Sequence, residues 1–281
     1  MIIREAATVG ERTLFTCYSE TDVNPRVDYD NFGHMICWHR RYNLGDKHEH
    51  KDPEDFLAAM VIEHCDAKRV YRFVKEGKAK EVRLTYDRKE RVWNLESLFN
   101  NKWFTEAEYP SGLTAKTVPS TFHEDVAEFL TIGEKMRLLR DNDIIIILPL
   151  FLYDHSGITM STGSFSCPFD SGQVGWIYAS KAEIIKEYGD ASKESIDKAK
   201  ALLQSEVKTY DLHLTGECYG FVTYEGAGVE DSYDGYLGEY ENFVTDLHGE
   251  LGDDWSEVID ALSHCSSNSV ADYFWERRRA A

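Results

Sequence analysis

Short apolar segments recur along the chain, and several of them alternate or run together as β-strands do. The most apolar run, Ile144 to Leu152, predicts a strand over Ile144–Tyr153 that is buried on both sides and therefore interior to a sheet. A polar DRKE turn joins two further strand-like segments into a predicted hairpin. The segments with strand patterns are Arg12–Tyr18, His34–Arg41, Glu81–Tyr86, Arg91–Leu95, Gly157–Thr162, Val174–Tyr178 and Cys218–Tyr224.

Other segments carry apolar residues at helical spacing, with recognisable start and stop signals. Asp52 and Pro53 begin one helix, and Gly189 ends another. The predicted helices are one starting at Pro53, then Arg69–Lys75, Thr121–Arg140, Ser180–Tyr188, one capped by Ser192 and ending near Gly216, Tyr240–Leu251, Asp254–Cys265 and Val270–Arg279.

The order of these elements predicts an α+β fold with a mostly antiparallel central sheet and flanking helices. We expect residues 1–224 to form this core and residues 225–281 to form an acidic, mainly helical C-terminal region. The aromatic but irregular stretch Ser97–Pro119 is expected to be a long packed loop or a connector between subdomains.

Composition places the chain among globular proteins. Its 281 residues are 42% hydrophobic and 13% aromatic, which is enough to build a core. No apolar run reaches the length of a membrane span, and the N-terminal residues lack the apolar region of a signal peptide. The six cysteines have no paired spacing, which is typical of reduced thiols. We therefore expect a cytoplasmic protein that does not enter membranes.

The net charge of −19 is unevenly distributed. Residues 217–272 contain fourteen acidic residues and no Lys or Arg. Such a segment repels nucleic acids and favours a basic partner surface or a cation, although a solvated surface that maintains solubility explains it equally well. The expected partner-binding residues are Glu230, Asp231, Asp234, Glu239, Glu241, Asp253, Asp254 and Glu257.

A dense group of polar residues lies in Tyr153–Tyr178, directly after the apolar run. As an active site it would use Cys167 or a nearby serine (Ser161, Ser164 or Ser166) as nucleophile, His155 as base and Asp154 or Asp170 as orienting acid. The spacing matches no known nucleophile motif, however. A ligand-binding or partner-binding loop and a purely structural loop therefore remain as alternatives.

A second polar group occupies residues 34–50. His34, Cys37, His39, His48 and His50 offer metal-ligating atoms, but at irregular spacing. Arg40 and Arg41 are suited to holding an anion. If this segment faces the first one, both form a single pocket, whose expected ligand-binding residues are Arg40, Arg41, Asp154, His155, Ser156, Asp170, Ser171 and Gln173.

Residues 230–241 match a calcium-binding loop in part. Gly235, Leu237 and Glu241 fall at the required sixth, eighth and twelfth positions, whereas Glu230 replaces the usual first Asp and a strand precedes the segment. Asp234 and Glu241 would be ligands of this calcium ion. No other cofactor is expected.

Three strings, CWHRRYNLGDKH, HSGITMSTGSFSCPFDSGQVGWIY and SEVKTYDLHLTGE, resemble a largely uncharacterised family of proteins encoded by bacteriophages and other mobile elements. The resemblance covers Met35 to Tyr224 and implies expression inside an infected bacterium and interference with a host system. We therefore expect a non-enzymatic accessory protein that binds and inhibits a bacterial host defence or regulatory component through its acidic surface. The alternative is an enzyme or binding module that acts on a nucleotide or other small anionic ligand at the Arg40/Arg41 and Asp154–Gln173 segments.

Overall fold

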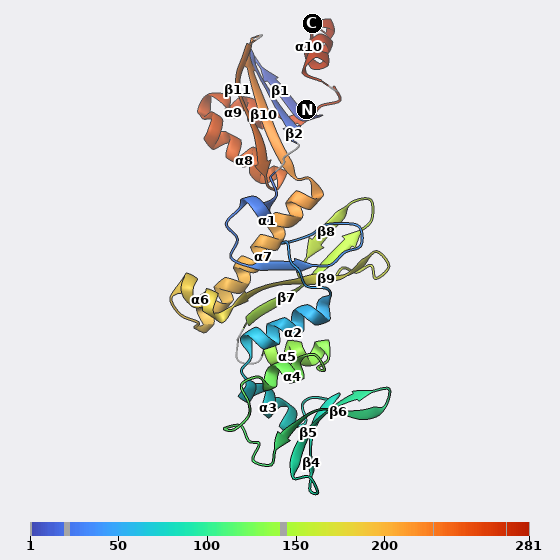
Figure 1. Ribbon diagram of the computed structural model, residues 1–281. Coiled ribbons are helices and arrows are strands. Elements are labelled where there is room, and N and C mark those ends of the chain that lie inside the picture. The colour runs from blue at the N-terminus through green and yellow to red at the C-terminus, as the bar shows by residue number, and fades with distance from the viewer. Residues whose placement is uncertain (1, 20–22, 141–144, 227, 268, 281) are drawn as a thin grey trace. The chain divides into compact units, whose positions relative to one another are not determined.

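The computed structural model describes residues 2–19, 23–140, 145–226, 228–267 and 269–280. The α+β prediction is confirmed: antiparallel sheets and helices make up the chain (Figure 1). Its contacts divide it into two compact units, each assembled from separate stretches of sequence. Unit 1 contains Met1–Asn31, Phe151–Gln173 and Gln204–Ala281, and unit 2 contains Phe32–Leu150 and Val174–Leu203. This division does not follow the expected boundary after Tyr224.

Unit 1 is built on a five-stranded antiparallel sheet with the strand order β11-β10-β2-β1-β12. The strands are β1 (Ile2–Val9), β2 (Arg12–Tyr18), β10 (Cys218–Glu225), β11 (Gly228–Leu237) and β12 (Ser263–His264). Phe15 of β2 lies opposite Val222 of β10, so strands far apart in sequence pair at the centre of the sheet. The predicted strands Arg12–Tyr18 and Cys218–Tyr224 are confirmed. The region after Tyr224 is less helical than expected, because β11 pairs with β10 as an edge strand.

Helices cover both faces of this sheet. On one face, α8 (Tyr240–Leu251), a 3-10 turn (Asp253–Trp255) and α9 (Ser256–Asp260) bury Phe243 and Trp255 against Leu14. On the other face, α10 (Val270–Ala280) packs Phe274 edge-on against Phe15. The helix predicted over Asp254–Cys265 ends early, at Asp260, because residues 263–264 join the sheet next to β1.

The remaining parts of unit 1 surround the end of a long helix, α7 (Lys193–Thr215). Asp211 accepts hydrogen bonds from the Thr159 hydroxyl at 2.7 Å and the Met160 amide at 2.6 Å, which fixes β8 (Ile158–Ser161) to the helix. A buried ion pair of 2.8 Å between Arg26 and Glu206 fixes the short helix α1 (Pro25–Asp28). These contacts position the polar segment that follows β8.

Unit 2 has a core of helices packed on a three-stranded antiparallel sheet (Figure 1). Phe56, Val70, Phe122, Leu139 and Leu95 of these elements are all buried in one cluster. Its helices are α2 (Pro53–His64), α3 (Ala67–Lys75), α4 (Phe122–Ala127) and α5 (Ile132–Arg140), and its strands are β4 (Val82–Asp87), β5 (Val92–Phe99) and β6 (Lys102–Pro110). As predicted, Asp52 caps α2 by accepting from the amides of Glu54 and Asp55.

A second, four-stranded sheet has the order β3-β9-β7-β8, with β3 at His34–Cys37, β9 at Ser171–Ser180 and β7 at Ile145–Asp154. The boundary between the units passes through β7 and β9. β7 is an interior strand, as predicted, although Ile144 lies outside the described residues. After β9, α6 (Lys181–Tyr188) begins with a capping box of Ser180 and Glu183 and ends at Gly189, whose φ is +84°.

Three predictions for unit 2 are wrong. The stretch Ser97–Pro119 is not a loop over most of its length, because β6 pairs with β5 across a two-residue turn. Asn100 and Asn101 both have positive φ in this turn, as a tight hairpin requires. The helix predicted over Thr121–Arg140 is two helices, because Thr131 and Glu134 form a capping box that begins α5: each side chain accepts from the other residue's amide. The strand predicted over His34–Arg41 ends at Cys37.

Cysteine burial agrees with the reduced-thiol prediction: all six cysteines are free, and four of them are buried. Burial raises the pKa of Cys17 and of Cys65 to about 11, so these thiols stay protonated at neutral pH. Across the described stretches of chain, no helix is both long and apolar enough to cross a membrane.

Candidate functional site

Asp170 lies at the centre of the polar segment in unit 1. Its carboxylate is 3.6 Å from Nδ1 of His155 and accepts a hydrogen bond from the Cys167 thiol at 3.5 Å. The backbone closes the same loop, because the Asp154 amide donates to the carbonyl of Asp170 at 2.8 Å. Ser171 donates to the Cys167 carbonyl at 2.5 Å. The structure therefore brings together His155, Cys167 and Asp170, three of the residues expected to act here.

The contacts among Cys167, Asp170 and His155 follow a different order from those in an active site where a histidine base activates a cysteine nucleophile. In such sites the imidazole contacts the thiol and the carboxylate contacts the imidazole. Here Oδ2 of Asp170 accepts the hydrogen bond of the thiol and also lies nearest to the imidazole of His155, which is 63% exposed. Ser156, at φ +57°, and Gly157 turn the chain tightly beside it. The arrangement stabilises a loop shape more directly than it activates Cys167.

The histidine-rich segment of unit 2 distributes its side chains among separate partners. His34 contacts Glu183 at 2.6 Å, and Nε2 of His48 is 2.9 Å from the Cys37 carbonyl. His39 stacks on Tyr42 with ring centroids 4.9 Å apart. His50 is the remaining member of the segment, and its Nδ1 is 3.6 Å from Asp55.

Arg40 is exposed and belongs, like Arg41, to unit 2, whereas Asp154 to Gln173 belong to unit 1. The pocket expected to join these two segments therefore stays a prediction.

The calcium-loop residues lie in regular secondary structure. Residues 228–237 form the extended strand β11, which contains Asp234, and Glu241 lies in the first turn of α8. An extended strand does not wrap its side chains around one ion as a calcium loop does. Within the described ranges, no group of three or more His, Cys, Asp or Glu side chains is arranged to hold a metal ion.

The carboxylates expected to bind a partner are all exposed, on β11, α8 and the turn into α9 of unit 1. We call this set the acidic surface; it comprises Glu230, Asp231, Asp234, Glu239, Glu241, Asp253, Asp254 and Glu257. Two of them meet basic side chains: Glu239 pairs with Lys208 at 2.7 Å, and Asp254 lies 3.8 Å from Arg12. The other six form no ion pair among the residues that the structure describes.

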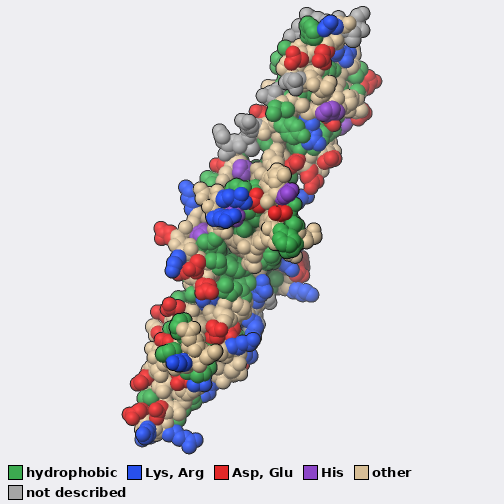
Figure 2. Space-filling model, turned by 90° about the vertical axis from the view of Figure 1, so that its right-hand side faces the viewer, with side chains coloured by type: hydrophobic (Ala, Val, Ile, Leu, Met, Phe, Trp, Pro, Cys, Tyr) green, Lys and Arg blue, Asp and Glu red, His purple; other side chains and the backbone are tan. Residues whose placement is uncertain are grey.

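The acidic surface contrasts with the side of the molecule shown in Figure 2. That view presents the right-hand side of Figure 1, whereas α8 and α9 lie at the left of unit 1 (Figures 1 and 2). On the side in view, acidic and basic side chains are interspersed.

A cavity of about 350 Å³ opens beside the acidic surface, between β10, β11 and α8. We call it the aromatic pocket; it is lined by Phe221, Tyr233, Tyr236, Phe243, Asp246, Leu247 and Glu250. The rings of Phe221 and Tyr233 are stacked with centroids 6.2 Å apart, and those of Tyr236 and Phe243 lie 5.1 Å apart.

The chemistry of the aromatic pocket favours a cation. The faces of aromatic rings carry negative electrostatic potential and attract Lys and Arg groups, and carboxylates add a direct charge attraction. The Tyr236 hydroxyl donates to Asp246 at 2.9 Å. Burial, and secondarily this carboxylate, raises the pKa of Tyr236 to about 12, so the phenol stays neutral and adds no negative charge of its own near pH 7.

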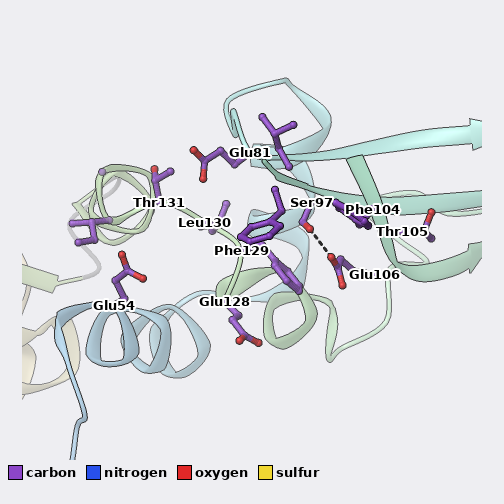
Figure 3. Close-up of a pocket in the computed structure, with 14 residues that line it drawn as sticks. Glu54, Glu81, Ser97, Phe104, Thr105, Glu106, Glu128, Phe129, Leu130 and Thr131 are labelled. Atoms are coloured by element: carbon purple, nitrogen blue, oxygen red, sulfur yellow. Dashed lines mark hydrogen bonds between the residues drawn. The ribbon is translucent and has the colours of Figure 1, made fainter. Parts of the chain in front are cut away.

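Unit 2 contains a larger cavity of about 800 Å³ that also combines carboxylates with aromatic rings (Figure 3). We call it the glutamate cavity; its lining includes Glu54, Glu81, Glu106, Glu128, Phe104 and Phe129. All four glutamates are exposed to solvent. Every described residue of this cavity lies within unit 2.

Comparisons with known proteins provide no family or function for the chain: no protein-family model matches it, and neither curated proteins nor solved structures gave a significant match. The candidate sites therefore rest on geometry and chemistry alone.

Both cavities escaped prediction from sequence, for different reasons. The aromatic pocket needs β11 to pair with β10, and the acidic segment was expected to be helical there. The strand predicted over Cys218–Tyr224, which carries Phe221, was a usable signal for one wall. The glutamate cavity needs the β5–β6 hairpin, whose signal was the Asn100–Asn101 pair.

Proposed function

We propose that unit 1 binds a protein partner with a basic surface, and that the aromatic pocket holds one Arg or Lys side chain of that partner. The observation that carries the proposal is the position of this pocket: its carboxylates Asp246 and Glu250 lie on α8, and its rings come from β10, β11 and α8, so β11 and α8 carry both the pocket and part of the acidic surface. Six carboxylates of that surface have no basic partner in the described chain, so their charge is available to another molecule.

The two parts of the surface contribute differently to recognition. Exposed carboxylates attract a basic partner over roughly 8 Å at physiological salt and thereby raise the association rate. A side-chain cation that enters the aromatic pocket gains about 0.5 to 2 kcal/mol from ring contact, depending on how fully it is desolvated. The acidic surface therefore provides attraction, and the pocket provides a fixed point of attachment.

The resemblance to proteins of bacteriophages and mobile elements supports a more specific role. In this proposal the partner is a defence or regulatory component of the bacterial host, present in the cytoplasm of the infected cell, and binding inhibits it. A target that itself binds nucleic acid presents a basic surface of the required kind. Direct binding of nucleic acid by the acidic segment is disfavoured by its charge.

The proposal is tested by recovery of a specific host protein from bacterial lysate on the immobilised chain at about 50 and about 500 mM salt. The test variant reverses three charges of the acidic surface: Glu230→Lys, Asp234→Lys and Glu241→Lys. The control reverses three exposed, unpaired acidic residues elsewhere: Asp30→Lys, Glu187→Lys and Asp197→Lys. We expect the control to retain the host protein and the test variant to lose it. Equal recovery by both variants contradicts the proposal.

The contacts of Asp170 with His155 and Cys167 support a second candidate, an enzyme or binding module for a nucleotide or other small anion. His155→Ala and Cys167→Ala each abolish biological activity if this is correct. A panel of nucleotides then also raises the melting temperature of the wild-type protein, because a ligand stabilises the folded state that it binds. Full activity of both variants contradicts this second candidate.

A further inference from the structure

The glutamate cavity has the size of a small-molecule site and an unusual mixture of walls. Its volume of about 800 Å³ lies in the range of roughly 300 to 1,000 Å³ that ligand pockets occupy. Figure 3 shows Glu54, Glu81, Glu106 and Glu128 distributed around Phe129, each on a different element or connecting segment. The cavity thus combines a central apolar surface with separate negative groups.

The apolar part of the cavity is left open to solvent. Phe99 is 65% exposed, Phe104 is 47% exposed and Ile132 is 39% exposed, and all three line the cavity. Large apolar side chains that gather in a concave, exposed site are typical of ligand-binding surfaces. An occupant must therefore offer apolar groups to these side chains.

The negative part of the cavity is not neutralised internally. None of the four glutamates forms an ion pair within the described residues. A buried cation lies close by: Lys135, which is 2% exposed, donates to the carbonyl of Glu54 at 3.3 Å. Burial lowers the pKa of this lysine, while Glu54 and Glu128 act in the opposite direction. Because the four carboxylates form no ion pair among the described residues, a positively charged occupant gains from pairing with them.

Two local features fix these walls. In β6, Glu106 is the extra residue of a β-bulge, because Leu95 faces Ala107 while the adjacent Glu96 faces Thr105. Its carboxylate accepts from the buried Ser97 hydroxyl at 2.5 Å, so the bulge and this bond hold it at the cavity. On the opposite wall, Glu134 accepts from the amides of Thr131 and Lys80, which fixes the connection between α4 and α5.

From these observations we propose that the glutamate cavity binds an aliphatic polyamine. Ammonium groups separated by methylene chains match carboxylates that are separated around an apolar centre, because each amine pairs with a different glutamate while the methylenes cover the phenyl rings. A divalent metal ion lacks the apolar body, and a single ammonium group reaches too few of the carboxylates. The inference concerns unit 2 alone and does not depend on the function proposed for unit 1.

The test is titration calorimetry of the whole chain with spermidine at about 150 mM salt, where weak attraction to a chain of net charge −19 is screened. We expect one saturable site. Glu81→Gln together with Glu128→Gln weakens binding by about tenfold or more, since two charge-assisted contacts are lost. The matched control, Glu187→Gln with Asp197→Asn, removes the same charge from exposed positions on α6 and α7 and retains wild-type affinity. Phe104→Ala weakens binding without any change in charge.

Several results overturn the proposal. Equal weakening by both double variants shows that spermidine responds only to net charge. If Mg²⁺ displaces spermidine at equal concentration, the site recognises positive charge alone. If 1,6-hexanediol displaces spermidine, the site recognises apolar groups alone. Binding of a Lys-rich peptide at this cavity, without binding of spermidine, assigns it to a protein partner instead. Circular dichroism of each variant confirms that a lost affinity is not a lost fold.

Discussion

The aromatic pocket and the glutamate cavity use the same two chemical groups in opposite arrangements. In the aromatic pocket the phenyl rings of Phe221 and Phe243 are each 2% exposed and belong to the core of unit 1. In the glutamate cavity the rings of Phe99 and Phe104 are largely exposed and belong to the rim. One site is therefore a gap in a core with carboxylates at its mouth, and the other is an open basin with carboxylates around it.

This difference bears on what each site binds. A small pocket with a rigid floor accepts a single side chain whose cation stacks on the rings, and the surrounding acidic surface contributes long-range attraction. A larger basin with exposed rings gains most from a flexible ligand that covers those rings while it pairs with several carboxylates. These arrangements underlie our proposals that unit 1 binds a protein partner and unit 2 a small polycation.

The largest predicted effect is a difference in unfolding free energy between variants that lose a ring of the aromatic pocket and variants that lose a ring of the glutamate cavity. Phe243→Ala removes a core side chain and costs about 3 to 5 kcal/mol of unfolding free energy. Phe104→Ala removes an exposed ring and costs less than about 1 kcal/mol. Urea denaturation of both variants measures the two values. Similar costs for the two variants contradict the assignment of one ring to the core and the other to the rim.

The next largest effect is the loss of stability when the first turn of a helix is altered, compared between α5 beside the glutamate cavity and α8 beside the aromatic pocket. Glu134→Ala removes the capping box of α5 and leaves the Thr131 and Lys80 amides without their acceptor, at a cost of about 1 to 3 kcal/mol. Glu239→Ala is the comparison, because α8 begins there without a side-chain cap and Glu239 makes only an exposed ion pair. Its expected cost is below about 1 kcal/mol. Equal denaturation midpoints for the two variants contradict this account.

The smallest effect is a pH dependence specific to the aromatic pocket. The pKa of Tyr236 is raised to about 12, mainly by burial, so the unfolded chain loses this phenolic proton at lower pH than the folded chain. The associated stability is complete below about pH 10 and is lost as the pH rises towards 12. Between these values, wild type should lose more stability than Tyr236→Phe in urea denaturation. Parallel losses contradict the raised pKa.

Local signals account for the parts of the fold that the sequence could predict. Asp52 with Pro53 and Gly189 fix helix ends through contacts within a few residues, and the sequence predicted both ends. The Thr131–Glu134 capping box and the Asn100–Asn101 turn are equally local, but they lie inside stretches whose apolar pattern suggested one long helix and one long loop. The predictions for these two stretches followed the apolar pattern over many residues and therefore missed the capping box and the turn.

The two cavities could not be predicted because they depend on contacts between strands and helices that are far apart in the sequence. The other two candidate sites could be. The polar loop at Asp170 was found because its residues are neighbours in sequence. The acidic surface was found because charge counts need no structure. The rings of the aromatic pocket come from β10, β11 and α8, and those of the glutamate cavity from β5, β6 and the α4–α5 connection. Such long-range contacts are set by the fold as a whole.

The most direct test of the central claim, that the two cavities bind two different kinds of cation, is one calorimetric comparison. An arginine-containing peptide and spermidine are each titrated into wild type, Asp246→Asn with Glu250→Asn, and Glu81→Gln with Glu128→Gln. We predict that the first variant loses affinity for the peptide and keeps it for spermidine, and that the second does the reverse. If both variants lose affinity for both ligands to the same extent, the chain binds cations through its overall charge and the claim is wrong.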